Sequence, residues 1–468
     1  MLDKILVLDM DTYGSISIAR KLRSQHIYCK ILPGDSAASE VAAQDASGIV
    51  WAGQESDLRP LDEGILNLDT PMLAVGAAAL QLADMLGAQS DGSILTDTTA
   101  PVEYDAQLLF EGISSGERWF SRAERLTLSP NLMSIAKANG VDVGFCDKNR
   151  SLYGLQFSFE RNDPDGVEML ANFCVQICGC TKWWSTEAFV ERATSELARL
   201  AGNGLLICAL SGGVDSSVCA MLCKRAVGSR MRPVFIDTGL MRQGEDRRIE
   251  SFCRQQLNSD LTREDARELF LDRLKCISDP CGKEQAVNGA FWEALTRSVG
   301  CEAESATLVL GTNYSEVLDG DGSSDIDREY APFRAVVEPL IELFKDEVRA
   351  VGELLGLPQS IIQMQSFPAT GLAGRILGEV DAGRLNILRA ADVIFQEEIE
   401  AAGQERRLRQ YYAMLTDSRD TTLVLRALSG GEKATAARLP FDLLGRVVER
   451  VGADLPGVKH VYYELTAE

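Results

Sequence analysis

Two adjacent glycines, an aspartate and three serines stand between an apolar run and a helix-like segment in LSGGVDSSV, residues 210–218. Gly212 and Gly213 allow the backbone to approach an anion closely and to adopt positive φ angles. The N–H groups of such a loop and of the helix after it point into one space, where the helix dipole adds positive potential. Asp215 would repel a phosphate by itself, but it fits a site in which Mg²⁺ bridges carboxylate and phosphate. The stretch predicts a phosphate and magnesium site built from Ser211, Gly212, Gly213, Val214, Asp215, Ser216 and Ser217.

The elements that would position this loop alternate between strand-like and helical segments. In the first 180 residues, 4–10 and 27–33 read as strands on either side of a helical segment at 16–25. This is the βαβ rhythm of a doubly wound α/β sheet. Residues 185–202 predict a linking helix with Ser185 at its N-cap. The rhythm then repeats from residue 203 to residue 366, with the glycine loop directly after a strand.

The last part of the chain has a different pattern. Residues 381–411 predict one long helix, and residues 441–454 predict an amphipathic helix between strands at 421–429 and 460–468. We therefore expect two doubly wound α/β domains, at 1–184 and 185–366, and a small α+β domain at 367–468.

The composition is that of a globular protein, with 46% hydrophobic and 25% charged residues among 468. The formal net charge of −22 disfavours a nucleic-acid partner. The sequence has no run of about 18 apolar residues, so we expect no membrane span. Twelve cysteines without a signal peptide predict a reducing cytoplasmic location. We interpret CVQICGC at 174–180 as buried thiols and not as a metal site.

The glycine loop resembles the PP-loop of ATP pyrophosphatases and lacks the spacing of a Walker A loop. Four further segments resemble glutamine-hydrolysing GMP synthases: VFIDTGLMRQGE (234–245), EPLIELFKDEVRAVGELLGLP (338–358), FPATGLAGRILGEV (367–380) and ARLPFDLLGRV (437–447). The N-terminal segment through residue 33 resembles the class I glutamine amidotransferase domain of the same family. The resemblance covers nearly the whole chain in the same order.

The resemblance implies a three-part enzyme. An amidotransferase domain releases ammonia from glutamine, a PP-loop domain uses ATP and Mg²⁺ to adenylate the O2 carbonyl of xanthosine monophosphate, and a C-terminal domain forms a homodimer. It implies that Asp215 and Lys345 are catalytic, with Asp215 at the metal and Lys345 at a phosphate. The other nucleotide-binding residues that it implies, besides the loop, are Asp237, Gly239, Gly311 and Thr312.

The amidotransferase half departs from the family at its chemical groups. Gly76 stands at the nucleophilic cysteine of the elbow, and Ser158 replaces the histidine of F-H-P-E while Glu160 remains. A thiolate attack needs both a thiol and a base that activates it. We therefore expect this domain to have no glutaminase activity.

The acceptor side departs as well. The family motif R-H-P-F-P-G-P-G-L-A reads MQSFPATGLA at 364–373, so an arginine and a histidine are missing. The H-H-N-V-G-G segment is replaced by REYAPFRAV at 328–336, and the usual C-terminal end is absent. These losses predict a changed acceptor, although GMP formation stays open.

Two alternatives remain beside this interpretation. Cys276 and Cys281 could relay sulfur to the activated acceptor if Lys275 or Lys283 lowered a thiol pKa. Asn313 and Glu316 resemble the GTN…E pattern of NAD synthetases and PP-loop sulfur transferases. The chain could instead be a non-catalytic paralogue that binds ATP and a protein partner.

The sequence thus predicts a cytoplasmic ATP-dependent ligase that forms C–N bonds and releases AMP and pyrophosphate. Its partners would be ATP, Mg²⁺, a small-molecule acceptor that could be nucleotide-like, and ammonia or another nitrogen or sulfur donor. We expect no nucleic-acid partner and no membrane association. We expect the protein to form a homodimer.

Overall fold

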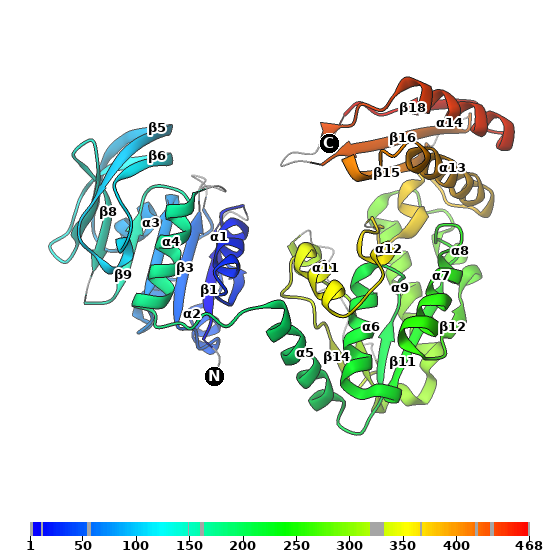
Figure 1. The fold of residues 1–468 in the computed structure, drawn as a ribbon, viewed down its shortest axis with the longest axis horizontal. Helices are drawn as coiled ribbons and strands as arrows, with labels where there is room; N and C mark the ends of the chain where they lie inside the picture. Colours follow the sequence, from blue (N-terminus) through cyan, green and yellow to red (C-terminus); the bar gives the residue numbers. More distant parts are fainter. Residues whose placement is uncertain are drawn as a thin grey trace. The chain divides into compact units, whose positions relative to one another are not determined.

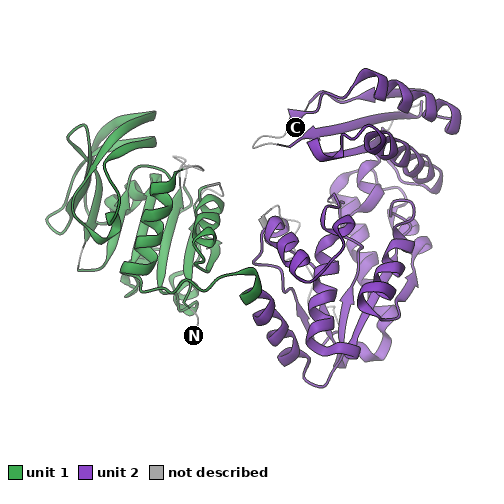
Figure 2. Ribbon diagram, in the orientation of Figure 1, with its two compact units in different colours: residues 1–188 green, residues 189–468 purple. Residues whose placement is uncertain are grey.

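The computed structural model describes residues 3–10, 13–53, 58–147, 149–159, 163–318, 332–365, 367–416, 420–430 and 435–466. The chain forms two compact units, residues 1–188 and residues 189–468 (Figure 2). The boundary lies in the first turn of α5 (Thr186–Ala201), whose Ala188 N–H donates to Ser185 Oγ at 3.1 Å as the N-cap prediction requires. The division of the second unit at residue 366 stays a prediction.

The first unit is built on a nine-stranded sheet of order β2-β1-β3-β4-β9-β8-β7-β5-β6. Its parallel strands are β1 (Ile5–Asp9), β2 (Cys29–Pro33), β3 (Gly48–Gly53), β4 (Met72–Gly76) and β9 (Leu152–Leu155). The antiparallel strands are β5 (Gln89–Tyr104), β6 (Gly116–Thr127), β7 (Met133–Ala138) and β8 (Val141–Asp147). The predicted strands at 4–10 and 27–33 are thus confirmed.

Helices cover the parallel part of this sheet (Figure 1). They are α1 (Tyr13–Ser24), α2 (Ala38–Ala43), α3 (Ala77–Met85) and α4 (Pro164–Asn172), with short helical turns at Glu63–Asn67, Leu108–Phe110 and Phe173–Ile177. All five residues of β1 and all five of β4 are buried, as expected for parallel strands covered on both faces.

The second unit begins with a five-stranded, fully parallel sheet of order β12-β11-β10-β13-β14. Its strands are β10 (Leu206–Ala209), β11 (Met231–Asp237), β12 (Thr262–Asp265), β13 (Thr307–Val309) and β14 (Ala335–Val337). The chain leaves β10 toward β11 on one side and later returns to β13 on the other. The carboxyl end of β10 is therefore the topological switch point, where open α/β sheets bind ligands.

The helices around this sheet begin with α5 and α6 (Val214–Val227), and Gly228, at φ +62°, ends α6. The others are α7 (Glu245–Phe252), α8 (Arg267–Leu274), α9 (Pro280–Val299), α10 (Tyr314–Leu318), α11 (Lys345–Leu354) and α12 (Gln359–Ile362), with short turns at Gly228–Arg230, Cys253–Leu257, Gly300–Ser305 and Gly371–Arg375. No helix in the described part of the chain is long and apolar enough to cross a membrane.

A separate sheet ends the chain, with order β15-β16-β17 and β18 parallel to β16. Its strands are β15 (Leu408–Leu415), β16 (Thr422–Ser429), β17 (Thr435–Ala436) and β18 (His460–Tyr463), packed with α13 (Ala382–Ala401) and α14 (Phe441–Asp454). The predicted helix at 381–411 is wrong beyond Ala401. Gly403 adopts φ +63°, which ends the helix, and the chain then turns into β15.

One continuous apolar core joins this sheet to the parallel sheet. It contains Ile207 and Val234 of the parallel strands, Leu388 of α13, and Leu425 and Val447 of the last sheet and helix. The shared core explains why residues 189–468 form one compact unit. The predicted fold class, two doubly wound α/β parts followed by a small α+β part, is confirmed.

Candidate nucleotide-binding site

The glycine loop connects the end of β10 to the start of α6, at the switch point of the parallel sheet. Gly212 adopts φ +85°, which other L-residues rarely adopt, and a Cβ there would lie 2.9 Å from Ile249 Cδ1. Gly213 is the N-cap of α6, and Val214 is the buried first residue of the helix. The N–H groups of the first helical turn have no partner within the helix, so they are available to an anion.

The serine hydroxyls shape this loop. Ser216 Oγ accepts from the Ser211 N–H at 3.2 Å and lies 3.1 Å from Ser211 Oγ. Ser217 Oγ donates to the Gly213 carbonyl at 2.8 Å. Ser216 and Ser217 are both buried. These bonds fix the loop conformation, so the backbone amides and the exposed Ser211 are the groups best placed for a phosphate.

Asp215 lies at the centre of the charged part of the site. Its Oδ2 forms an ion pair with Lys345 Nζ, the first residue of α11, and its Oδ1 accepts from Asn313 Nδ2 at 3.3 Å. The two catalytic residues predicted from the resemblance are thus in direct contact. Asn313, which the sequence singled out for another reason, orients the same carboxylate.

The segment after β13 completes this side of the site. A Cβ at Gly311 would lie 2.8 Å from the Ser216 backbone nitrogen, so glycine allows the β13 end to approach the start of α6. Thr312 Oγ1 donates to Glu338 Oε1 at 2.7 Å. Asn313 and Glu316 hydrogen-bond reciprocally, backbone N–H to side chain, at 3.2 and 3.4 Å. This reciprocal pair caps α10 and holds Asn313 next to Asp215.

Asp237 and Gly239 follow β11 on the other side of the switch point. Asp237 accepts from Arg263 Nη2 at 2.7 Å and from the Gly239 N–H at 3.2 Å. The hydrogen bond to Asp237 raises the pKa of Arg263. Arg389 of α13 donates to the Gly239 carbonyl at 2.6 Å. These bonds hold the β11 loop in place, and they tie it to the last part of the chain.

The residues present fit a magnesium ion that is held jointly with phosphate. Mg²⁺ usually takes one or two carboxylates and completes its shell with water and phosphate oxygens. Asp215 supplies one carboxylate at the start of α6, and its orientation is fixed by Asn313. Within the described ranges, no cluster of three or more metal-ligating side chains is present.

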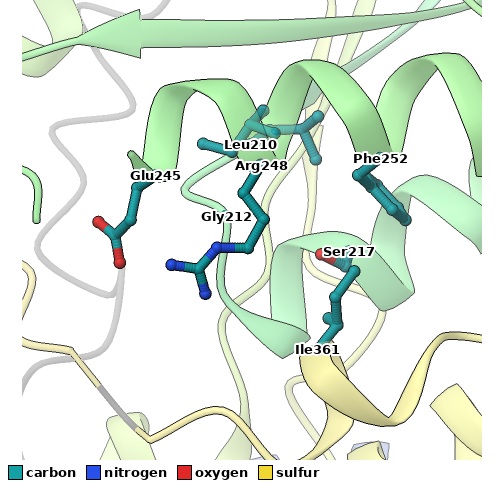
Figure 3. Close-up of a pocket in the computed structure, with 8 residues that line it drawn as sticks. Leu210, Gly212, Ser217, Glu245, Arg248, Phe252 and Ile361 are labelled. Atoms are coloured by element: carbon teal, nitrogen blue, oxygen red, sulfur yellow. The ribbon is translucent and has the colours of Figure 1, made fainter. Parts of the chain in front are cut away.

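A small pocket beside the loop contains residues that the sequence prediction missed (Figure 3). Its lining residues are Leu210, Gly212, Ser217, Glu245, Arg248, Ile249, Phe252 and Ile361. The sequence signal that could have found the α7 residues is the helical pattern of 245–252, which follows β11 and its loop closely. That pattern places one face of α7 against the glycine loop.

In the first unit, two positions that the family resemblance matches to amidotransferase residues, Gly76 and Ser158, lie together. Gly76 turns the chain from β4 into α3 with φ +69° and ψ −134°. A Cβ on Gly76 would lie 3.3 Å from Ser158 Oγ and only 2.5 Å from the Gly53 carbonyl oxygen. Ser158 is buried, and none of the described residues hydrogen-bonds its hydroxyl. Glu160 lies outside the described residues.

The two cysteines proposed as a sulfur relay flank the start of α9. Cys276, at φ +60°, and Cys281 are both exposed. Lys275 forms an ion pair with Asp272, and Lys283 is buried and donates to the Ala373 carbonyl at 3.3 Å. Both lysines therefore have partners other than the thiols, and the relay stays a prediction.

The other thiols are less available. Burial raises the pKa of Cys174 and Cys178 in CVQICGC, and it raises the pKa of Cys180 to about 11. The interpretation of this segment as largely buried thiols agrees with these positions, since Cys174 and Cys180 are buried and Cys178 is half-buried.

Comparison with known proteins places the site in a class. Residues 186–410 match the family model described as NAD synthase. This match covers the parallel sheet, the glycine loop and α13, and it places residues 186–410 in the class of NAD synthase-like PP-loop ATP pyrophosphatases.

Full-length relatives then define the family. The chain is 33% identical to the GMP synthase [glutamine-hydrolyzing] of Clostridium perfringens, over 100% of this chain and 98% of that protein. It is 34% identical to the protein of the same description from Thermomicrobium roseum, over 100% of this chain and 95% of that protein. The chain belongs to the GMP synthase family.

Solved structures also match parts of the chain. A putative GMP synthase subunit from Thermoplasma acidophilum matches with 23% identity and a TM-score of 0.33, over 38% of this chain and 95% of that one. An NH3-dependent NAD synthetase from Campylobacter jejuni matches with 20% identity and a TM-score of 0.32, over 39% of this chain and 79% of that one.

Proposed function

We propose that this protein is an ATP-dependent ligase that adenylates a carbonyl or carboxylate oxygen of a small acceptor for attack by ammonia or another amine. The observation that carries this proposal is the Asp215 carboxylate, held by Lys345 and Asn313 beside a glycine loop at the sheet's switch point. A site of this kind joins a cation, an oriented carboxylate and the backbone amides at the start of a helix, which are the groups that a nucleoside triphosphate requires.

The reaction has two balanced steps. The acceptor oxygen attacks the α-phosphorus of ATP, and the bond from that phosphorus to the α–β bridging oxygen breaks, so pyrophosphate leaves with the electron pair. The amine nitrogen then attacks the activated carbon, the carbon–oxygen bond breaks to release AMP, and the nitrogen gives up a proton to water. Adenylation thus turns a poor leaving group into a good one.

The residues of the chain supply position and charge in these steps. The amides at the start of α6 bind the phosphate oxygens, and Lys345 compensates the charge that develops on the departing pyrophosphate. Asp215 would hold Mg²⁺, which neutralises phosphate charge when it is bound. The Asn313 amide keeps the carboxylate in one orientation.

The first unit supplies no ammonia from glutamine in this proposal. Gly76 has no thiol, and the serine hydroxyl at position 158 is not a base that could activate one. The Gly53 carbonyl oxygen also faces the elbow, where it would repel the negative charge of a tetrahedral intermediate. The nitrogen therefore comes from free ammonia or from an amine.

A homodimer through residues 367–468 belongs to the same proposal. Three large apolar side chains in that part are strongly exposed, Phe441 at 85%, Tyr462 at 58% and Leu465 at 79%. Exposed apolar side chains that form one contiguous patch favour an interface. Size-exclusion chromatography with light scattering would measure the mass, and a mass equal to one 51.0 kDa chain at all concentrations would reject the dimer.

The test of the function is pyrophosphate release from ATP and Mg²⁺ with xanthosine monophosphate and an ammonium salt, compared with glutamine in place of ammonium. Turnover with ammonium only is expected if the acceptor is the one that the relatives' name implies. If the protein binds ATP but is inactive with xanthosine monophosphate, the proposed acceptor is a different carbonyl compound. It would then be sought among other nucleotides and carboxylic acids. Turnover with glutamine in place of ammonium would reject the proposal that the first unit has no glutaminase activity.

A further inference from the structure

Arg248 lies on α7 beside the glycine loop, and the proposed chemistry gives it no role so far. Its side chain lines the small pocket together with Gly212 and Ser217 of the loop (Figure 3). The residue is exposed, so a ligand can reach its guanidinium group without rearrangement of the core.

The guanidinium of Arg248 has no carboxylate partner within the described residues. Its hydrogen-bond contact is the Met364 thioether sulfur, a weak acceptor, at 3.7 Å from Nη1. The acidic residues Asp246 and Glu250 of the same helix pair with Arg263, at 3.3 and 3.2 Å. Glu245, three positions before Arg248 on α7, lines the same pocket, and its Oε2 accepts from the Arg242 N–H at 3.1 Å. Arg248 therefore has no carboxylate hydrogen bond among the described residues, and it lies next to a loop whose amides are suited to phosphate.

A second arginine reaches the same residue from another helix. Arg349 of α11 donates from Nη2 to the Met364 carbonyl at 3.5 Å, and it lies one helical turn after Lys345. Met364 stands at the arginine of the family motif R-H-P-F-P quoted above. Two arginines thus contact Met364, Arg248 through its thioether sulfur and Arg349 through its carbonyl oxygen.

We propose that Arg248 binds the β- and γ-phosphates of ATP and stabilises pyrophosphate as it leaves. This inference rests on the proposed function, because it needs ATP in the glycine loop. When the bond between the α-phosphorus and the bridging oxygen breaks, negative charge moves onto that oxygen and the β-phosphate. A planar guanidinium can donate two parallel hydrogen bonds to such a group.

The experiment measures the affinity of the full-length protein for three probes, magnesium pyrophosphate, Mg-ATP and AMP, by titration calorimetry. Arg248→Ala and the neutral, similarly sized Arg248→Gln should each weaken pyrophosphate and ATP binding by about 10- to 100-fold, the size of one charge-assisted contact. AMP binding should change less than about twofold. Arg247→Ala is the matched control, because it removes the same charge from the neighbouring, exposed position, which does not line the pocket.

The titration results test the role of Arg248 and the proposed function separately. Unchanged pyrophosphate affinity in Arg248→Ala or Arg248→Gln would overturn the role of Arg248, while ATP binding by the unmodified protein would leave the proposed function standing. Equal weakening of AMP and pyrophosphate would also overturn it, because the effect would then not be specific to the leaving group. Failure of the unmodified protein to bind either ATP or pyrophosphate would reject the proposed function and this inference together.

Discussion

The ammonium group of Lys345 forms an ion pair with the carboxylate of Asp215, although the two residues are 130 positions apart in the sequence. Their side chains are only 25% and 14% exposed, so the pair is partly shielded from water. The contact holds a cation suited to phosphate against a carboxylate suited to a metal. Binding of Mg-ATP would exchange this contact for Lys345 to phosphate and Asp215 to the metal, so that both charges keep partners.

Neutralising either member of this pair should abolish ATP chemistry. We expect Asp215→Asn and Lys345→Met each to lower pyrophosphate release by at least about 100-fold, the usual effect of losing an electrostatic group at a reacting centre. The double variant should be little worse than either single one, because the two residues act as a unit. Asp346→Asn, a neighbouring exposed carboxylate, is the control and should retain turnover. Retention of full activity by Asp215→Asn would contradict the assignment of the site.

Restoring the amidotransferase residues should not restore glutamine hydrolysis. In Gly76→Cys with Ser158→His, the new Cβ would meet the Gly53 carbonyl oxygen at 2.5 Å, so the elbow must shift before a thiolate can act. We expect no glutaminase activity and a loss of about 1–3 kcal/mol in stability from the positive φ and the contact. A glutaminase assay and urea unfolding would measure the two effects.

A pair of alanine variants separates strain from contact at this position. Gly87 also has a positive φ, +79°, but no atom of another described residue, its two chain neighbours aside, lies within 4 Å of a Cβ placed there. Gly87→Ala should therefore cost less stability than Gly76→Ala. Equal costs would show that the Gly53 carbonyl yields easily, and they would remove the steric argument.

Thiol labelling should distinguish three cysteines from the other nine. Cys276, Cys281 and Cys301 are exposed. Cys253, by contrast, is buried, and burial raises the pKa of its thiol to about 12. We expect fast reaction of the three exposed thiols in the folded protein and reaction of the others only after unfolding, as measured by mass spectrometry after maleimide treatment.

The same cysteines allow a test of sulfur transfer. Cys276→Ala with Cys281→Ala should retain turnover with ammonium, because the proposed amidation uses no thiol. Cys301→Ala is the control for the loss of an exposed thiol elsewhere. A specific loss of activity in the first variant would favour the sulfur relay over amidation.

Asp392 should be the most sensitive charged residue of the second unit. It is 1% exposed, pairs with Arg375 at 3.2 Å and Arg242 at 3.3 Å, and accepts from the Ala413 N–H at 3.0 Å. Burial lowers the pKa of Arg375 to about 10, and the Asp392 charge opposes that shift. Asp392→Ala leaves buried guanidinium groups without a counter-charge, so we expect a loss of about 3–5 kcal/mol in the free energy of unfolding.

The control for this variant lies on the same helix. Glu397 pairs with Arg450 through a side chain that is 54% exposed, so Glu397→Ala should cost less than about 1 kcal/mol. Similar losses for Asp392→Ala and Glu397→Ala in urea unfolding would show that the buried cluster does not hold α13 against the β11 loop.

The sequence by itself determined the features that depend on local patterns or on which residue type stands at one position. The glycine loop, the alternation of strands and helices, and the N-cap at Ser185 follow from residues within a few positions of one another. That Gly76 carries no thiol and Ser158 no imidazole can be read from the residue types alone. The predicted helix at 381–411 is too long because Gly403, with its positive φ, ends the helix at Ala401.

Only the tertiary structure decided which distant residues meet. The order β11-β10-β13 brings Lys345 and Asn313 to Asp215, places the Gly311 backbone against Ser216, and sets Arg248 beside Gly212. Lys283, which the sequence offered as a partner for a thiol, is instead buried against the Ala373 carbonyl. Such contacts depend on strand order and on how helices pack on the sheet. Neither is encoded in the spacing of nearby residues. The burial of apolar faces fixes how strands and helices pack, and this packing decides which polar side chains come into contact.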